Sequence, residues 1–409
     1  MPAKIMYTKC IKNTVGFYGG LSMITRIQIK NINAIDSCDI DFQKNKYKYL
    51  EEMIYNDKLV NPVAFYGTNG SGKSSFLEAV SSLVILLTED SKSFSCFIPN
   101  HLNAEDYIDR KNRESKKNKE KAKKTPQDNF AELVSSIKIF FEINQKQYEY
   151  FIETCVSGWI NNETLSVDGN VIFERSVEYY NYKNNAVKIN KTLFPTIRKL
   201  ATENQDDANI IKSFDFLSNM SFIDASKKNF LFKDIIEKDS LDIIVEKSKE
   251  VNEILKEYKE FPLYNVYSEI TKDGTKSYHA VIEAGERELQ LPFSFISSGM
   301  MNQSLLLSVL VSLPENGVLF IDEIEDALHP LTVLDFIKAA RKKNIQLIFS
   351  SHNTFILQHL RPDQIFFANW NNGYSTYKKL SDIYPNIREI NNIEKMYLAN
   401  LFDEDIKNG

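Results

Sequence analysis

The chain has 409 residues, and its 43% hydrophobic and 26% charged residues exclude a mainly disordered protein. A formal net charge of −5 excludes a polycation, so any contact with nucleic acid has to come from a local patch or from a partner. Four widely separated cysteines favour neither a zinc site nor a disulfide framework, and the short apolar runs predict a cytoplasmic protein without a membrane span or secretory signal.

The first lobe of the fold is predicted over residues 23–106. Residues 1–22 show no clear periodicity, and we interpret them as an N-terminal extension. The sequence ITRIQIKNINAIDSCDIDF that follows alternates like two strands. The apolar run at 63–66 predicts a buried strand, and the helical spacing of apolar residues over 76–87 predicts a helix soon after it.

The middle of the chain is predicted to be an insertion. Arginine and lysine dominate residues 107–128, which we expect to be an exposed basic loop. Alternation over 135–151 predicts a hairpin with further strands after it, and residues 189–260 have helical spacing. We expect residues 129–264 to form an inserted α+β and helical subdomain, because the segment is longer than any ordinary connection.

The second lobe is predicted over residues 265–385, with residues 386–409 as a C-terminal tail. After a run of strands come SSGMMNQ, a helix, the strand VLFID, another helix, and the strands QLIFS and QIFFA. This alternation predicts an α/β fold, namely a nucleotide-binding head that the insertion splits in two.

Residues 67–74, GTNGSGKS, match the phosphate-binding pattern GxxxxGK[ST], with a strand expected before it and a helix after it. Glycines let backbone N–H groups and a helix N-terminus approach phosphates closely. Lys73 is placed to neutralise the β- and γ-phosphates of ATP, and the Ser74 hydroxyl suits Mg²⁺. A glycine-rich turn before a helix is the alternative, which the flanking elements disfavour. The candidate nucleotide-binding residues are Gly67, Thr68, Asn69, Gly70, Ser71, Gly72, Lys73, Ser74 and Ser75.

The apolar run 318–321 ends in two carboxylates, Asp322 and Glu323. At the C-terminal edge of a buried strand beside the P-loop, Asp322 can hold Mg²⁺ through water, and Glu323 can orient or deprotonate the water that attacks ATP. An acidic turn after a strand is the common alternative. The complete P-loop elsewhere in the chain favours the catalytic interpretation.

His352 follows the apolar strand 345–349 after two serines. At the end of a strand in a head with a P-loop, a histidine can contact the γ-phosphate and the attacking water. A helix-capping or core histidine is the alternative, and it would be preferred if the residue stood alone.

Ser298 and Gly299 stand before the apolar run 305–313. Hydroxyls and a glycine at a helix N-terminus form an anion site. The simpler interpretation is an ordinary helix cap. The sharper one is that this helix end binds the γ-phosphate held by another subunit.

In their order along the chain, the motifs YGTNGSGKSS, SSGM, IDEIEDALHP and SSHN resemble those of ABC-class ATPases of the SMC, RecF and OLD type. A closer resemblance is to the AAA-family ATPases of bacterial anti-phage and abortive-infection systems, including the Septu, PARIS and Gabija ATPases. Further matching segments are IKIFFEI, YEYFIE, LRPDQIFF and NIEKMYLANLF. The resemblance extends from Met23 to Phe402 and is weakest over 90–130 and 180–260.

The resemblance implies a split ABC-type head of the P-loop NTPase class, in which two copies sandwich two ATP molecules with Mg²⁺. Ser298 and Gly299 of each head would complete the site of the other. Glu325, Asp326 and His329 correspond to the D-loop, which crosses the interface between heads, so Asp326 is a further candidate nucleotide contact.

Two departures from the sequences of these families argue against particular functions. The signature SSGMMNQ differs from the transporter sequence LSGGQ, which argues against a transporter subunit. OLD and Gabija proteins carry a Toprim nuclease with metal-binding acids, whereas few residues follow QIFFA here, so we expect this chain to lack that nuclease. The five histidines are scattered and predict no HNH-like site.

We therefore hypothesise an ATPase that works as a homodimer or larger homo-oligomer in anti-phage defence, without a membrane partner. It would act as a sensor, scaffold or regulator of a separately encoded effector, which we expect to be a nuclease. One alternative is a RecF-like ATPase that binds DNA in repair or recombination, and another is a scaffold that binds ATP and turns it over very slowly. The run 110–124, with nine lysines and arginines against two glutamates, could bind nucleic acid or be a solvated loop.

Overall fold

The computed structural model describes most of the chain. The described residues are 22–89, 97–100, 103, 105, 133–203, 207–225, 229–231, 240–257, 264–284, 287–326, 328–388, 391–399 and 401–402. The expected extension at 1–22, apart from Ser22, and the expected basic loop at 107–128 lie outside them. No described helix is both long and apolar enough to span a membrane.

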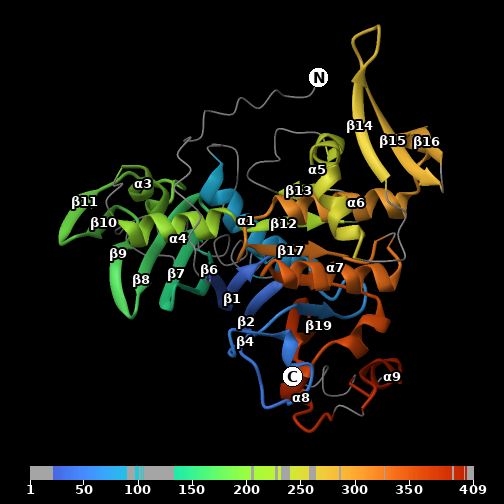
Figure 1. The fold of residues 1–409 in the computed structure, drawn as a ribbon. Coiled ribbons are helices and arrows are strands. Elements are labelled where there is room, and N and C mark those ends of the chain that lie inside the picture. Colours follow the sequence, from blue (N-terminus) through green and yellow to red (C-terminus); the bar gives the residue numbers. More distant parts are fainter. Residues whose placement is uncertain are drawn as a thin grey trace, which may run out of the picture.

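A seven-stranded sheet forms the centre of the described fold (Figure 1). In spatial order its strands are β13 (Asn229–Leu231), β12 (Ser221–Asp224), β17 (Val318–Asp322), β18 (Gln346–Ser350), β5 (Val63–Tyr66), β19 (Ile365–Asn371) and β20 (Tyr374–Lys379). The five inner strands run parallel, and β13 and β20 are antiparallel at the edges. Parallel strands are covered on both faces, which explains the uninterrupted apolar runs VAFY and VLFI.

The central sheet has a hydrophobic core on each face. In β5, Val63 and Phe65 belong to one core, and Ala64 and Tyr66 belong to the other. The helices of the first core are α1 (Lys73–Thr88), α3 (Thr196–Glu203) and α4 (Ala208–Ser218). The helices of the second are α5 (Ser240–Leu255), α6 (Ser298–Ser312), α7 (Pro330–Lys342), α8 (Leu380–Ile383) and α9 (Ile393–Leu398).

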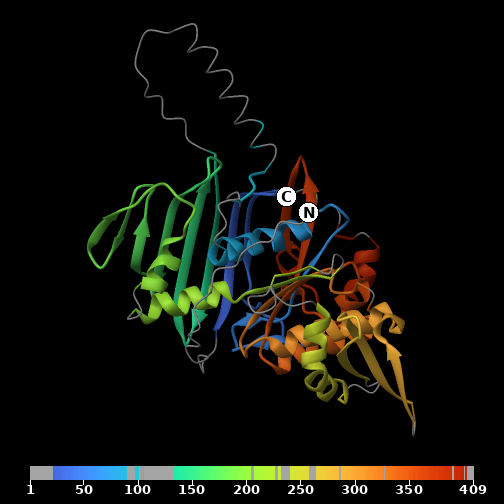
Figure 2. The same ribbon diagram turned by 90° about the horizontal axis from the view of Figure 1, so that it is seen from above.

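An antiparallel sheet of eight strands closes the first core. In spatial order these are β11 (Asn185–Lys188), β10 (Tyr179–Tyr182), β9 (Asn170–Arg175), β8 (Trp159–Val167), β7 (Lys146–Cys155), β6 (Val134–Ile143), β1 (Ser22–Ile32) and β2 (Ile35–Asp41). Helix α1 contacts strands of both this sheet and the central sheet, and Figure 2 shows it where the two sheets meet. The first core is therefore shared between the two sheets.

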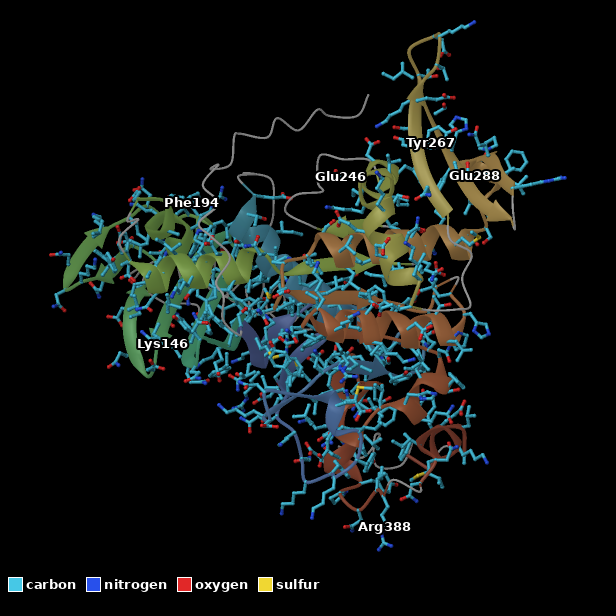
Figure 3. All side chains as sticks on the ribbon, viewed as in Figure 1. Lys146, Phe194, Glu246, Tyr267, Glu288 and Arg388 are labelled. Atoms are coloured by element: carbon cyan, nitrogen blue, oxygen red, sulfur yellow. The ribbon has the colours of Figure 1, made fainter. Side chains whose placement is uncertain are left out.

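A small antiparallel sheet stands apart from these layers, and its strands are β14 (Tyr264–Ile270), β15 (Lys276–Ala284) and β16 (Arg287–Pro292). Figure 3 shows Tyr267 and Glu288 on this outlying sheet. The 3₁₀ helix η2 (Phe293–Phe295) then leads into α6. Shorter elements elsewhere are η1 (Glu51–Met53), β3 (Ile54–Tyr55), β4 (Leu59–Val60), η3 (Thr354–His359) and η4 (Pro362–Gln364).

The α/β class predicted from the sequence is confirmed, but the insertion is not arranged as we expected. Residues 129–264 do not form a sheet of their own: β6 pairs with β1 in the first sheet, and β12 pairs with β17 in the central one. The expected helical stretch 189–260 also contains β12 and β13. The edge strand β20 was not predicted, and Phe402 of the expected tail is buried in the second core. These strand pairings depend on long-range packing, which cannot be predicted from local periodicity in the sequence.

Candidate nucleotide-binding site

The loop between β5 and α1 is held tightly against its neighbours. Gly67, Gly70 and Gly72 have φ angles of 151°, 76° and 99°, which residues with side chains rarely adopt. A Cβ at Gly67 would lie 2.3 Å from the carbonyl oxygen of Ala368, and a Cβ at Gly72 would lie 1.9 Å from Oγ of Ser375. Glycine is therefore required at both positions for β19 and β20 to pack this closely against the loop.

Lys73 is buried at the first position of α1. Its Nζ atom donates hydrogen bonds to the carbonyl oxygens of Gly67, at 3.0 Å, and Thr68, at 3.1 Å. Burial lowers the pKa of Lys73, and nearby negative charge opposes that shift. The carboxylates that oppose it are those of Asp322, Glu323 and Glu325. The ammonium group thus lies in the electrostatic field of the acids that follow β17.

The remaining loop residues differ in exposure. Residues 68–70 are exposed, whereas Ser71 is fully buried and its hydroxyl has no hydrogen-bond partner among the described residues. Ser74 and Ser75 are half-buried in the first turn of α1. The N–H groups of a first helical turn have no partners within the helix, so this turn can accept an anion.

Ser350 hydrogen-bonds to both Asp322 and Glu323. It is fully buried at the end of β18, the strand between β17 and β5. Its Oγ atom accepts a hydrogen bond from the backbone N–H of Glu323 at 2.8 Å and donates one to the carboxylate of Asp322. Strand β18 pairs with both β17 and β5, so one strand lies between the strand that ends in Asp322 and the strand before the P-loop.

Glu323 has the left-handed φ angle of 54°. This conformation costs a non-glycine residue about 1–2 kcal/mol, so the surrounding structure has to enforce it. The N–H of Glu323 and that of Ile324 both bond to Ser350, to its hydroxyl and its carbonyl oxygen respectively. Two bonds to one residue therefore hold the strained turn, and strain of this kind concentrates at functional sites.

His352 lies on the loop that follows β18, and this loop packs against the end of β5. The N–H of Ser351 donates to the carbonyl oxygen of Phe65 at 3.0 Å, and the Tyr66 hydroxyl donates to that of Asn353 at 3.1 Å. The backbone N–H of His352 donates to the carboxylate of Glu325, and the residue itself is exposed. The loop after β18 and the loop after β5 thus meet at one edge of the central sheet.

Ser298 and Gly299 occupy a second location, at the start of α6. The helix cap is Ser297, whose Oγ accepts from the N–H of Met300 at 3.3 Å. Ser298 follows as the first helical residue and is exposed. Ser298 therefore does not cap its own helix.

Asp326 joins this second location to the acids. Asn302 of α6 donates through Nδ2 to the carbonyl oxygen of Asp326 at 3.2 Å and to its carboxylate at 3.4 Å. The N–H of Asp326 in turn donates to the carbonyl oxygen of Glu323 at 2.9 Å. His329, also in this segment, caps α7 by accepting from the N–H of Leu331.

The sequence analysis missed two residues that support the loops. Ser350 appears in the motif SSHN, but its position in that motif carries no indication that it binds both acids. Tyr377 of β20 donates from its hydroxyl to the carbonyl oxygen of Gly72 at 2.6 Å. It lies in no motif, so only the fold reveals its contact with the P-loop.

Residues 63–358, which include every residue of both locations, match the family described as "AAA domain, putative AbiEii toxin, Type IV TA system". The chain belongs to this family. Its AAA domain begins at the first residue of β5 and continues past His352 into η3. Together with the parallel strands of the central sheet, this confirms the α/β class that the sequence predicted. No curated protein matches the chain.

Three solved SMC heads are similar in structure to this AAA-domain protein. The SMC head bound to the C-winged helix domain of ScpA is 13% identical, with a TM-score of 0.48 over 88% of this chain and 99% of that one. The SMC head domain from Thermotoga maritima is 12% identical, with a TM-score of 0.42 over 87% and 98%. A head with an extended coiled coil, bound to the C-terminal domain of ScpA from Pyrococcus furiosus, is 12% identical, with a TM-score of 0.42 over 95% and 100%.

Proposed function

We propose that this chain binds ATP with Mg²⁺ and hydrolyses it at the C-terminal edge of the central sheet. One observation carries the proposal: three motifs that are distant in sequence meet at that edge, namely the loop after β5, the acids after β17 and the loop after β18. Ligands of open α/β sheets bind outside the carboxyl ends of the strands. The electrostatic interaction of Lys73 with Asp322 and Glu323 supports a site shared by the P-loop and these acids.

The side chains present fit a magnesium nucleotide. The N–H groups of the P-loop and of α1 would hold the phosphates, and Lys73 would neutralise the β- and γ-phosphates. Ser74 would bind Mg²⁺ directly and Asp322 through water. Mg²⁺ keeps several waters and needs few protein ligands.

Glu323 and His352 are the proposed catalytic residues. Glu323 would orient or deprotonate the attacking water, and its fixed backbone sets the direction of its side chain. His352 would contact the γ-phosphate from the loop beside β5. Both residues are at least partly accessible, as contact with a substrate requires.

We also propose that two copies form a homodimer around two nucleotides. Ser298 and Gly299 at the start of α6 would bind the γ-phosphate held by the other copy, since Ser298 is exposed and is not the cap of its helix. Asp326 would lie at the interface, linked to the same α6 through Asn302.

The proposed biological role is regulation of a separate effector, expected to be a nuclease, in bacterial anti-phage defence. The family description names an abortive-infection toxin and a toxin–antitoxin system, which supports defence rather than DNA repair. The motifs described above all serve nucleotide chemistry, which supports an effector on another chain.

The purified chain tests this function. We expect ATP hydrolysis that requires Mg²⁺ and is abolished by Lys73→Ala. We also expect no cleavage of DNA or RNA by the chain alone. Nuclease activity that persists in Lys73→Ala would overturn the regulatory role, and ATP-dependent binding to duplex DNA at low salt would favour the RecF-like alternative.

A further inference from the structure

Glu325 has a carboxylate whose two oxygens are used unequally. It lies in the turn after β17, and one oxygen accepts a hydrogen bond from the backbone N–H of His352. The other oxygen, Oε2, is buried and has no hydrogen-bond partner among the described residues. Leaving such an atom unpaired is energetically costly, so its retention needs an explanation.

The surroundings of Glu325 connect it to the P-loop. Its negative charge acts on Lys73. Burial raises the pKa of Tyr66, the last residue before the loop, and the charge of Glu325 adds to that shift. The turn that carries it is fixed by the bonds of Ser350 to Glu323 and of Asn302 to Asp326. Glu325 is therefore held in place by the backbone and does not need its own side chain to close the turn.

A purely structural clamp would explain only half of the side chain. To fasten the His352 loop, one neutral acceptor is sufficient, and an amide oxygen would provide it without a buried negative charge. The second oxygen is left without a hydrogen-bond partner among the described residues. It would gain one if a hydrogen-bond donor arrived with a ligand.

We propose that Glu325 is a positioning residue for ATP turnover. One oxygen fixes the backbone of His352, and the other accepts a hydrogen bond from a donor that enters with the magnesium nucleotide. This inference rests on the proposed function, because it requires that function's nucleotide site. It assigns to Glu325 a role distinct from that of Glu323, which stays the proposed base.

The test is Glu325→Gln, which keeps the size of the side chain and one acceptor oxygen for His352 but replaces the second acceptor with a donor. A fluorescent ATP analogue is titrated with Mg²⁺ and with EDTA. In the variant we expect its affinity with Mg²⁺ to be roughly ten- to a hundredfold lower than in the parent, and its affinity in EDTA to be unchanged. The thermal unfolding midpoint should be preserved. Glu315→Gln removes an equal charge from an exposed loop before β17 and serves as the matched control.

A second comparison separates positioning from general damage. We expect kcat to fall in Glu325→Gln and to fall further in Glu325→Leu, which also removes the acceptor for the N–H of His352. The step from Gln to Leu should cost much less kcat in a His352→Ala background, because the acceptor then has no catalytic side chain to position. A step of equal size in the two backgrounds, or a Glu325→Gln variant with the Mg²⁺ response of the parent, would overturn the inference. If the parent itself bound no nucleotide, the proposed function would fail instead, so the two failures are distinguishable.

Discussion

Glu163 and Glu325 are both acidic residues with buried carboxylate oxygens. Glu163 lies in the eight-stranded sheet and Glu325 in the turn after β17, and the two carboxylates have different numbers of hydrogen-bond partners. Glu163 of β8 is fully buried. One of its oxygens accepts from the Tyr150 hydroxyl at 3.0 Å and the N–H of Ile197 at 2.9 Å, and the other accepts from the N–H of Thr196 at 2.6 Å. The carboxylate of Glu325 has one partner and one unpaired oxygen.

The difference separates a carboxylate that holds the fold from one that we propose to contact a ligand. Glu163 caps the start of α3, with the guanidinium of Arg175 at 3.6 Å, and thereby fastens that helix to the eight-stranded sheet. Both of its carboxylate oxygens have hydrogen-bond partners within the protein. At the edge of the central sheet, Ser71 and Glu325 keep buried polar atoms unpaired. Substitutions near Glu163 should therefore lower the free energy of unfolding, and substitutions at the edge of the central sheet should lower ATP turnover.

The largest effect is expected for Glu323→Gln, at the ligand edge. Loss of the base should lower kcat by roughly 10²- to 10⁴-fold, while ATP binding and the free energy of unfolding stay near those of the parent. Single-turnover hydrolysis and urea unfolding measure the two quantities. Hydrolysis at the parental rate would show that another group is the base.

Glu163→Ala, in the eight-stranded sheet, should give the opposite pattern. Removing one member of a buried ion pair leaves the other charge uncompensated and costs about 3–5 kcal/mol of unfolding free energy. The ATP turnover of each folded chain should be unchanged. A loss of turnover without loss of stability would contradict the division between the two regions. If the variant does not fold, Glu163→Gln offers a milder version of the same test.

Ser350→Ala should affect both measurements. The substitution removes the hydroxyl that bonds to the N–H of Glu323 and to the carboxylate of Asp322. We expect kcat to fall by roughly ten- to a hundredfold and the unfolding free energy by about 1–3 kcal/mol. Ser351→Ala is the matched control, since that hydroxyl caps the N–H of Asn353 and touches neither acid. Equal kinetic losses in the two variants would contradict the assigned role of Ser350.

Tyr377→Phe should give the smallest effect. It keeps a ring that packs on Phe65 and Phe76 but loses the hydrogen bond to the carbonyl oxygen of Gly72. We expect a cost of about 0.5–1.5 kcal/mol in unfolding free energy and a modest rise in KM for ATP. A large fall in kcat at unchanged KM would instead assign this residue to the chemical step.

The sequence predicts the parts of the site whose signals are local. The P-loop stands between an apolar run and a helical pattern, and the structure has β5 and α1 there. The strands before Asp322 and before His352 are likewise predicted from contiguous residues. These segments have the uninterrupted apolar pattern that burial on both faces of a parallel sheet requires.

The rest of the site depends on contacts that no local pattern carries. The place of β12 beside β17, about a hundred residues later in the chain, follows from packing in the centre of the fold. Ser350 bonds to Asp322, and Tyr377 bonds to Gly72, which is distant in sequence. A serine or a tyrosine in a strand has no sequence pattern that would predict such a contact. The unequal use of the two oxygens of Glu325 is visible only once His352 is placed in space.

Calorimetric titration of the Glu323→Gln variant with ATP, with and without Mg²⁺, is the most direct test of a single nucleotide site shared by Lys73, Asp322 and His352. The proposed site predicts one ATP bound per chain with an affinity that depends on Mg²⁺, and loss of that binding when Lys73→Ala is added. Absence of heat on titration with ATP and Mg²⁺, or binding that survives Lys73→Ala, would contradict it.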